Sequence, residues 1–88
     1  MTTLEYSEEN SEDKILEALK QLKSHVLMEK GCLSISLSQV DSKFIIYETF
    51  KSRKDLETHK SQSYAKTFGE KLSNMNINSK VQILNSIN

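Results

Sequence analysis

Cysteine is scarce in this sequence of 88 residues, which contains Cys32 alone. A single cysteine cannot form an intrachain disulfide, and it cannot supply a thiolate metal cluster. A chain of this length buries only about 60 to 65% of the surface that its unfolded form exposes, so its core is thin. With no disulfide to support that core, we expect a second copy of the chain to stabilise the fold as a homodimer.

Net charge and long apolar runs are also missing. The sequence has 12 basic and 12 acidic residues, so no overall positive field attracts it to nucleic acid or to an anionic membrane. No apolar run approaches the roughly 18 residues that span a bilayer, and residues 1–10 are acidic and polar where a secretory signal is basic and then apolar. We therefore expect a cytoplasmic protein with neither a nucleic-acid nor a membrane partner.

The composition is otherwise that of an ordinary folded protein. Hydrophobic residues make up 36% of the chain and charged residues 27%, whereas a disordered chain combines low hydrophobicity with high net charge. We therefore expect residues 1–88 to fold as one domain.

The first part of the chain predicts a strand and a helix. Residues 2–6 alternate between polar and apolar positions, which indicates a short strand. Asn10 or Ser11 is a suitable helix cap, and an apolar stripe at helical spacing follows, in a helix that we expect to end at Gly31. The stripe consists of Ile15, Leu16, Leu19, Leu22, Val26 and Leu27.

Two further strands are predicted next. Leu33, Ile35 and Leu37 alternate with serines, which indicates a strand with one buried face. After a turn at residues 40–42, residues 44–50 form a strand that is largely apolar on both faces. One face carries Phe44, Ile46, Glu48 and Phe50, and the other carries Ile45, Tyr47 and Thr49. Because so short a chain has few elements left to cover the second face, we expect a twofold partner to pack there.

The remainder predicts two helical segments and a last strand. Ser52, with an aspartate three residues on, resembles a capping box at the start of a short helix. A second segment is expected to start near Ser61 or Ser63, with an apolar side made of Tyr64, Phe68 and Leu72. After a break over residues 74–79, the last strand is marked by Val81, Ile83 and Ile87. The order βαββαβ predicts an α+β, ferredoxin-like fold, with an antiparallel sheet and helices on one face.

Residues 29 to 68 contain a series of short motifs. They read E-K-G-C-L-S-I-S-L, and later F-I-I-Y-E-T-F-K-S-R-K-D-L-E-T-H-K-S-Q-S-Y-A-K-T-F. Their order resembles the antibiotic biosynthesis monooxygenase family, in which a helix ends at E-x-G-C, a strand ends in Y-E-x-W and a later helix carries H-x-x-S-x-H-F. The resemblance covers nearly the whole chain and implies a dimeric α+β barrel, in which two sheets pack face to face.

The resemblance also implies a range of activities. Members of the family include cofactor-free oxygenases of quinols, an isomerase of a phosphorylated quorum-sensing signal, and haem-degrading enzymes. This chain departs from the family pattern at three positions: Phe50 replaces the usual tryptophan, Tyr64 the second histidine and Ala65 the following aromatic. A haem-binding histidine would fall near Gly69, where there is none, so we expect no haem and no other cofactor. The two histidines lack the close spacing of a metal site.

Three residues are candidates for catalysis. Glu48 lies on an apolar face that should raise its pKa, so it is either a general acid or base or a structural carboxylate. His59 matches the first histidine of the family's helix motif and suits proton transfer near neutral pH, or else it is a solvent-facing helix residue beside Lys60. Tyr64 is either a donor to a developing oxyanion or, more simply, a core tyrosine. We interpret His25 and Cys32 as structural.

We expect an apolar substrate cavity between the sheet and the helices, lined by Ile46, Phe50, Leu56 and Phe68. The first hypothesis is a cofactor-independent monooxygenase that acts on a small quinol or enolisable aromatic compound. The second is a keto-enol isomerase of a small carbonyl or phosphocarbonyl compound, as in the quorum-signal branch of the family. The third is a non-catalytic ligand-binding or dimerisation module, which the loss of the second histidine and the tryptophan favours.

Overall fold

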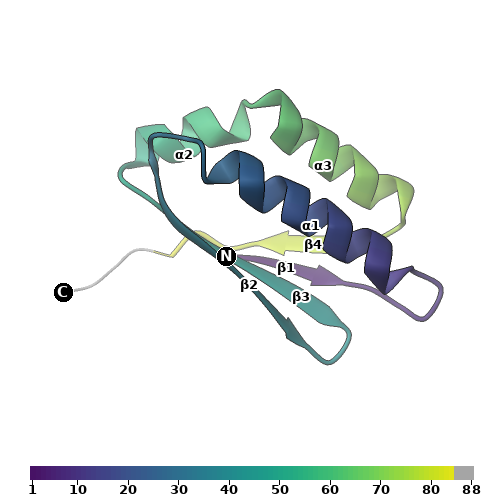
Figure 1. Cartoon of the computed structure of the whole chain (residues 1–88). Helices are drawn as coiled ribbons and strands as arrows, with labels where there is room; N and C mark the ends of the chain where they lie inside the picture. The colour runs from purple at the N-terminus through teal and green to yellow at the C-terminus, as the bar shows by residue number, and fades with distance from the viewer. Residues whose placement is uncertain (85–88) are drawn as a thin grey trace.

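The computed structural model of the protein describes residues 1–84 (Figure 1). Within them, four strands form one antiparallel sheet in the order β2-β3-β1-β4, and three helices lie against one of its faces. The elements are β1 (Thr2–Glu5), α1 (Glu12–Val26), β2 (Cys32–Val40), β3 (Lys43–Phe50), α2 (Arg53–Lys60), α3 (Ser63–Asn74) and β4 (Asn78–Val81). The predicted ferredoxin-like α+β fold is therefore confirmed.

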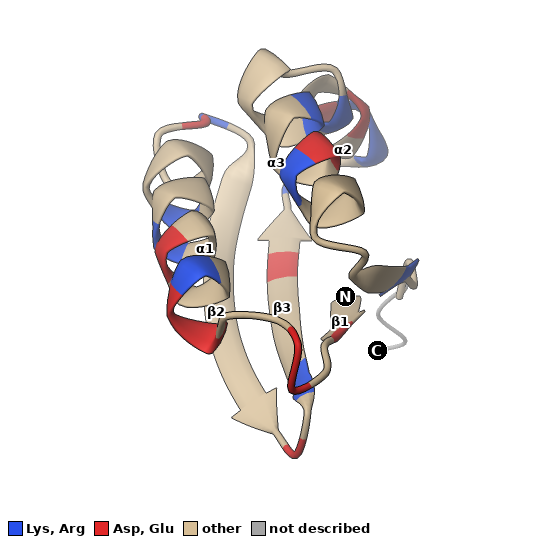
Figure 2. Ribbon diagram, turned by 90° about the vertical axis from the view of Figure 1, so that its right-hand side faces the viewer, with Lys and Arg blue, Asp and Glu red and all other residues tan. Residues whose placement is uncertain are grey.

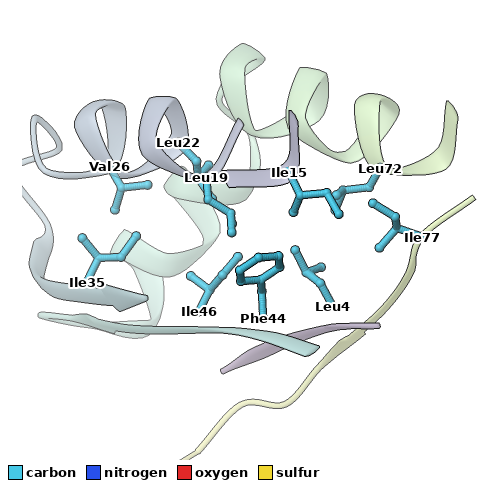
Figure 3. Close-up of a cluster of buried hydrophobic side chains, with 10 residues drawn as sticks. All are labelled: Leu4, Ile15, Leu19, Leu22, Val26, Ile35, Phe44, Ile46, Leu72 and Ile77. Atoms are coloured by element: carbon cyan, nitrogen blue, oxygen red, sulfur yellow. The ribbon is translucent and has the colours of Figure 1, made fainter. Parts of the chain in front are cut away.

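Helix α1 and the sheet enclose the hydrophobic core (Figure 3). The Ser11 side chain accepts a hydrogen bond from the amide of Lys14 and so begins the helix as predicted. The helix ends at Val26 rather than Gly31. From Met28 on, the backbone amides no longer bond to the carbonyl four residues back, and that of Met28 donates to His25, three residues back. The core consists of Leu4, Ile15, Leu19, Leu22, Val26, Ile35, Phe44, Ile46, Leu72 and Ile77.

The early end of α1 and a bulge in β2 correct two predictions of burial. Leu27 follows the last helical turn and is 57% exposed, so it does not belong to the buried stripe. In β2 the register shifts between Cys32 and Ser34, and Cys32 pairs with Phe50. Leu33 is consequently 62% exposed, because the extra residue of a bulge breaks the alternation of faces.

The last strand begins earlier than predicted. β4 spans Asn78–Val81 and pairs along its whole length with β1. The strand ends at Val81. Beyond it the backbones of Met1 and Gln82 exchange two hydrogen bonds, and Ile83 is not part of the ladder. Ile77, which precedes β4 within the predicted break, is buried in the core. The predicted Ile87 lies outside the described residues.

The face of the sheet away from the helices, which we call the open face, carries the second face of β3, as predicted. Ile45 is half-buried on it and Tyr47 is 43% exposed. Their paired neighbours on β2 are serines, and Ser34 shares a hydrogen bond of 2.6 Å with Thr49. The apolar part of the open face is therefore a small area in polar surroundings. None of the helices in the described part of the chain has the length and apolarity needed to cross a bilayer.

Candidate active site

Four polar side chains from four different segments meet between the helices and the sheet. Glu29 comes from the loop that joins α1 to β2, Glu48 from β3, His59 from α2 and Tyr64 from α3. We call them the histidine cluster. The side chains of both glutamates are 14% exposed and that of His59 is 12% exposed. The structure thus brings together the three residues predicted as catalytic, and it adds Glu29.

The imidazole ring of His59 lies between two carboxylates. Its Nδ1 atom is 2.7 Å from Oε2 of Glu29, and its Nε2 atom is 3.5 Å from Oε2 of Glu48. The Tyr64 hydroxyl donates a hydrogen bond to the same oxygen of Glu29 and lies 3.3 Å from His59 Nδ1. Oε2 of Glu48 is buried and has no hydrogen bond within residues 1–84. A proton on either His59 Nε2 or Glu48 Oε2 would allow a hydrogen bond between these two atoms, so that this oxygen would have a partner.

Burial shifts the acid-base properties of this cluster. It raises the pKa of the Glu48 carboxyl, an effect that the nearby His59 and the N-terminal ammonium group of Met1 oppose and that Glu29 increases. Burial also raises the pKa of the Tyr64 hydroxyl, as do its hydrogen bond to Glu29 and the charges nearby, so this phenol keeps its proton at neutral pH. Burial and the two carboxylates likewise raise the pKa of the Cys32 thiol, which agrees with a structural rather than a nucleophilic role.

Helix α2 is held against the loop that carries Glu29. Its cap is Ser52, whose hydroxyl oxygen accepts a hydrogen bond from the Asp55 amide and donates one of 2.9 Å to the Asp55 carboxylate. Asp55 packs directly on Gly31, where a Cβ atom would collide with it. The Lys51 amide also donates a hydrogen bond of 2.9 Å to the carbonyl of Gly31. Because Gly31 lets the loop and α2 approach so closely, His59 reaches Glu29.

Aromatic rings cover the cluster on two sides. The Phe50 ring lies 5.1 Å from that of His59, centroid to centroid. The His25 ring stacks on Tyr64 with centroids 4.8 Å apart and an angle of 19° between the planes. His25 was interpreted as structural, and it contacts the site through this stacking.

A groove runs between α1 and α3, which stand apart over the sheet in Figure 2. It consists of two hollows of about 290 and 360 Å³ that share Ala18, Gln21 and Lys71 in their walls. The smaller hollow is also lined by Leu22, His25, Ser63, Tyr64, Thr67 and Phe68. Tyr64 therefore belongs both to the groove and to the histidine cluster.

The groove differs from the cavity predicted between the sheet and the helices. Of the four residues expected to line that cavity, Phe68 borders the groove and Phe50 packs on His59. Leu56 is half-buried on α2. Ile46 is only 1% exposed because it lies in the core beneath the helices. The space next to Ile46 is therefore filled by side chains in this structure.

Glu29 is the member of the cluster that sequence reasoning missed. The signal available was its place in the E-x-G-C stretch, where it lies two residues before Gly31. In the described part of the chain, no group of three or more His, Cys, Asp or Glu side chains could hold a metal ion.

Comparison with known proteins assigns the family. The family model of the antibiotic biosynthesis monooxygenases matches residues 1–71, a range that includes the whole histidine cluster. The chain belongs to this family. No curated protein matches it.

Solved structures share the fold of this chain. A proposed antibiotic biosynthesis monooxygenase from Deinococcus radiodurans matches with a TM-score of 0.83 and 21% identity, over 99% of this chain and 92% of that one. A conserved protein of unknown function from Bacteroides thetaiotaomicron matches with a TM-score of 0.81 and 22% identity, over 90% of this chain and 85% of that one. At such identities the likeness concerns the fold alone.

Proposed function

We propose that this protein is a cofactor-independent monooxygenase that acts on a small quinol or another enolisable aromatic compound. Its membership of the antibiotic biosynthesis monooxygenase family supports a monooxygenase in general. The observation that carries the proposal is the His59 ring between the carboxylates of Glu29 and Glu48, with the hydroxyl of Tyr64 beside it. A histidine supported in this way is suited to removing a proton from a weakly acidic substrate.

The proposed reaction begins with deprotonation of the substrate. An O–H or activated C–H bond breaks, its proton moves to His59, and the electron pair stays on the substrate as an extended anion. This anion transfers electrons to dioxygen. One oxygen atom enters the product and the other leaves as water, so the substrate itself is the reductant. Tyr64 keeps its proton and serves as a hydrogen-bond donor to the anion.

The substrate-binding residues of this proposal are Phe50, Leu56 and Phe68, whereas Ile46 lies in the filled core and is not among them. Phe68 borders the groove and Phe50 covers His59, so a flat aromatic ring entering from the groove would meet apolar surfaces near the cluster. This position suits a small aromatic molecule, because ligand sites combine apolar walls with a few polar groups that set the orientation.

We also propose that two copies of the chain pair through their open faces. The exposed Tyr47 and the half-buried Ile45 form the apolar part of this face, and burying them against a second sheet would support the thin core. Analytical ultracentrifugation of the wild-type chain and of Tyr47→Lys at micromolar concentration is the test. A dimer that the substitution dissociates is expected, and a wild-type monomer would overturn the pairing.

Oxygen uptake tests the proposed activity. The purified protein would be incubated with hydroquinone, methylhydroquinone and dihydroxynaphthalene, and dioxygen consumption followed together with product formation. We expect His59→Gln to reduce turnover by about 100-fold or more, as loss of a general base does. Lys54→Gln, on the exposed surface of the same helix, is the control and should leave turnover unchanged.

Other outcomes would support the two alternatives. Conversion of an enolisable ketone without dioxygen uptake would indicate the isomerase. Binding of these compounds without turnover, unchanged in His59→Gln, would indicate the non-catalytic module and exclude the enzyme.

A further inference from the structure

We propose that Glu29 is the positioning residue of this site: it holds the proton of the neutral His59 ring on Nδ1 and leaves Nε2 as the basic nitrogen that faces Glu48. The proposal rests on the proposed function only where it concerns turnover. The tautomer of His59 is a property of the resting protein and can be measured without a substrate.

The hydrogen bonds of Glu29 carry the inference. An ionised carboxylate can only accept hydrogen bonds, so each partner at this short range must bring a proton. Both His59 Nδ1, at 2.7 Å, and the Tyr64 hydroxyl are directed at the same oxygen, Oε2 of Glu29. A neutral imidazole carries its single proton on one of its two nitrogens. With that proton held on Nδ1, the lone pair is left on Nε2.

The backbone keeps Glu29 in place for this role. Its amide donates a hydrogen bond of 3.0 Å to the carbonyl of Val26, and its own carbonyl accepts one of 3.2 Å from the Cys32 amide. The contact between Gly31 and Asp55 then fixes the distance from this loop to α2. Glu29 therefore lies in an anchored turn, so its carboxylate is held ready to orient the ring.

The surroundings of Nε2 point to the same arrangement. Oε2 of Glu48 lies 3.5 Å from this nitrogen, is buried and has no hydrogen bond among the described residues. An ionised Glu48 facing the lone pair of Nε2 would be doubly unfavourable, since neither atom would bring a proton. A neutral Glu48 carboxyl that donates to Nε2 satisfies both atoms. When Nε2 accepts a proton instead, the imidazolium is stabilised by Glu29 on its other side.

Nitrogen NMR tests the tautomer directly. Long-range proton–nitrogen correlation spectra of labelled wild-type protein near neutral pH should show a protonated Nδ1 and an unprotonated Nε2 for His59. In Glu29→Gln the charge that holds the Nδ1 proton is lost, and the spectra should shift toward a proton on Nε2. Glu57→Gln, which removes an exposed carboxylate from α2, should keep the wild-type pattern. A proton on Nε2 in the wild-type protein would overturn the proposal.

Turnover separates this proposal from the proposed function. With whichever hydroquinone the protein oxidises, Glu29→Gln should lower kcat at least about 10-fold with little change in KM, because it disturbs the base and not the groove. Glu29→Asp, which keeps the charge, should recover part of the loss. An equal loss of kcat in both variants would indicate a merely structural role and overturn the proposal. If no hydroquinone is oxidised but the His59 tautomer is as expected, the proposed function fails and the positioning role stands.

Discussion

The layer between the helices and the sheet has two unlike parts. Beneath α1 it is filled by aliphatic side chains and Phe44, as Figure 3 shows. Where α2 and α3 approach the end of β3, it is filled by two carboxylates, an imidazole and a phenol. Both parts are largely withdrawn from water. Burial in the first is favourable and non-directional, whereas the second is held by directed hydrogen bonds that must offset the cost of removing charge from water.

The two parts should therefore respond differently to substitution. Burying a large apolar side chain contributes about 1.5 to 3 kcal/mol, whereas a buried ion pair is often no more stabilising than an apolar pair of the same shape. We therefore expect the apolar part to contribute most of the stability of the fold and the histidine cluster to contribute less. The shifted pKa values of Glu48 and Tyr64 are typical of functional sites.

The largest effect is expected in the apolar part. Leu19 is fully buried in the core, and Leu19→Ala should lower the free energy of unfolding by about 3 kcal/mol, through lost burial and the cavity left behind. Leu27→Ala removes the same atoms from an exposed position and should change it by less than about 0.5 kcal/mol. Urea unfolding of both variants measures the difference. Equal losses of unfolding free energy in the two variants would mean that α1 does not bury the face that carries Leu19.

A smaller effect is expected where the two parts are joined. An alanine at position 31 would collide with Asp55, so Gly31→Ala should lower the free energy of unfolding by about 1 to 3 kcal/mol. A Cβ atom added at Gly69 would have no neighbour within 4 Å. Gly69→Ala within α3 should therefore raise the free energy of unfolding by about 0.5 to 1 kcal/mol. Thermal or urea unfolding compares the two. A stabilised Gly31→Ala protein would contradict the close approach of α2 to this loop.

The smallest effect is the pH dependence of stability in the histidine cluster. Because the pKa of Glu48 is raised in the folded protein above its ordinary value of 4.5, the folded chain holds this proton to higher pH than the unfolded chain does. The stability that the neutral carboxyl contributes is thus fully present below pH 4.5 and is lost as the pH rises through the raised pKa.

Glu48→Gln is the matched variant for this measurement, because it is neutral at every pH. The wild-type chain should lose stability relative to it as the pH increases, by about 1.4 kcal/mol for each unit by which the pKa is raised. Urea unfolding at several pH values, from about 4 to 7, covers this window. A difference in stability that stays constant over this range would show that the carboxyl ionises alike in both states.

Most of the fold could be predicted because it depends on local patterns. The apolar stripe of α1, the caps at Ser11 and Ser52 and the alternation in β3 are all read within a few residues. The misplaced features depend on pairing between distant segments. The bulge that turns Leu33 outward is a property of the β2–β3 ladder, and the bounds of β4 follow from its pairing with β1.

The candidate site divides in the same way. His59, Glu48 and Tyr64 could be singled out from residue type, apolar surroundings and motif. Their meeting point could not, because Glu29 is 30 residues from His59 and 35 from Tyr64 in the chain. The sequence by itself determined which side chains are able to exchange protons and which faces are apolar, since both follow from chemistry and spacing. Only the tertiary structure decided that one carboxylate binds both His59 and Tyr64, because that contact depends on how closely α2 packs on Gly31.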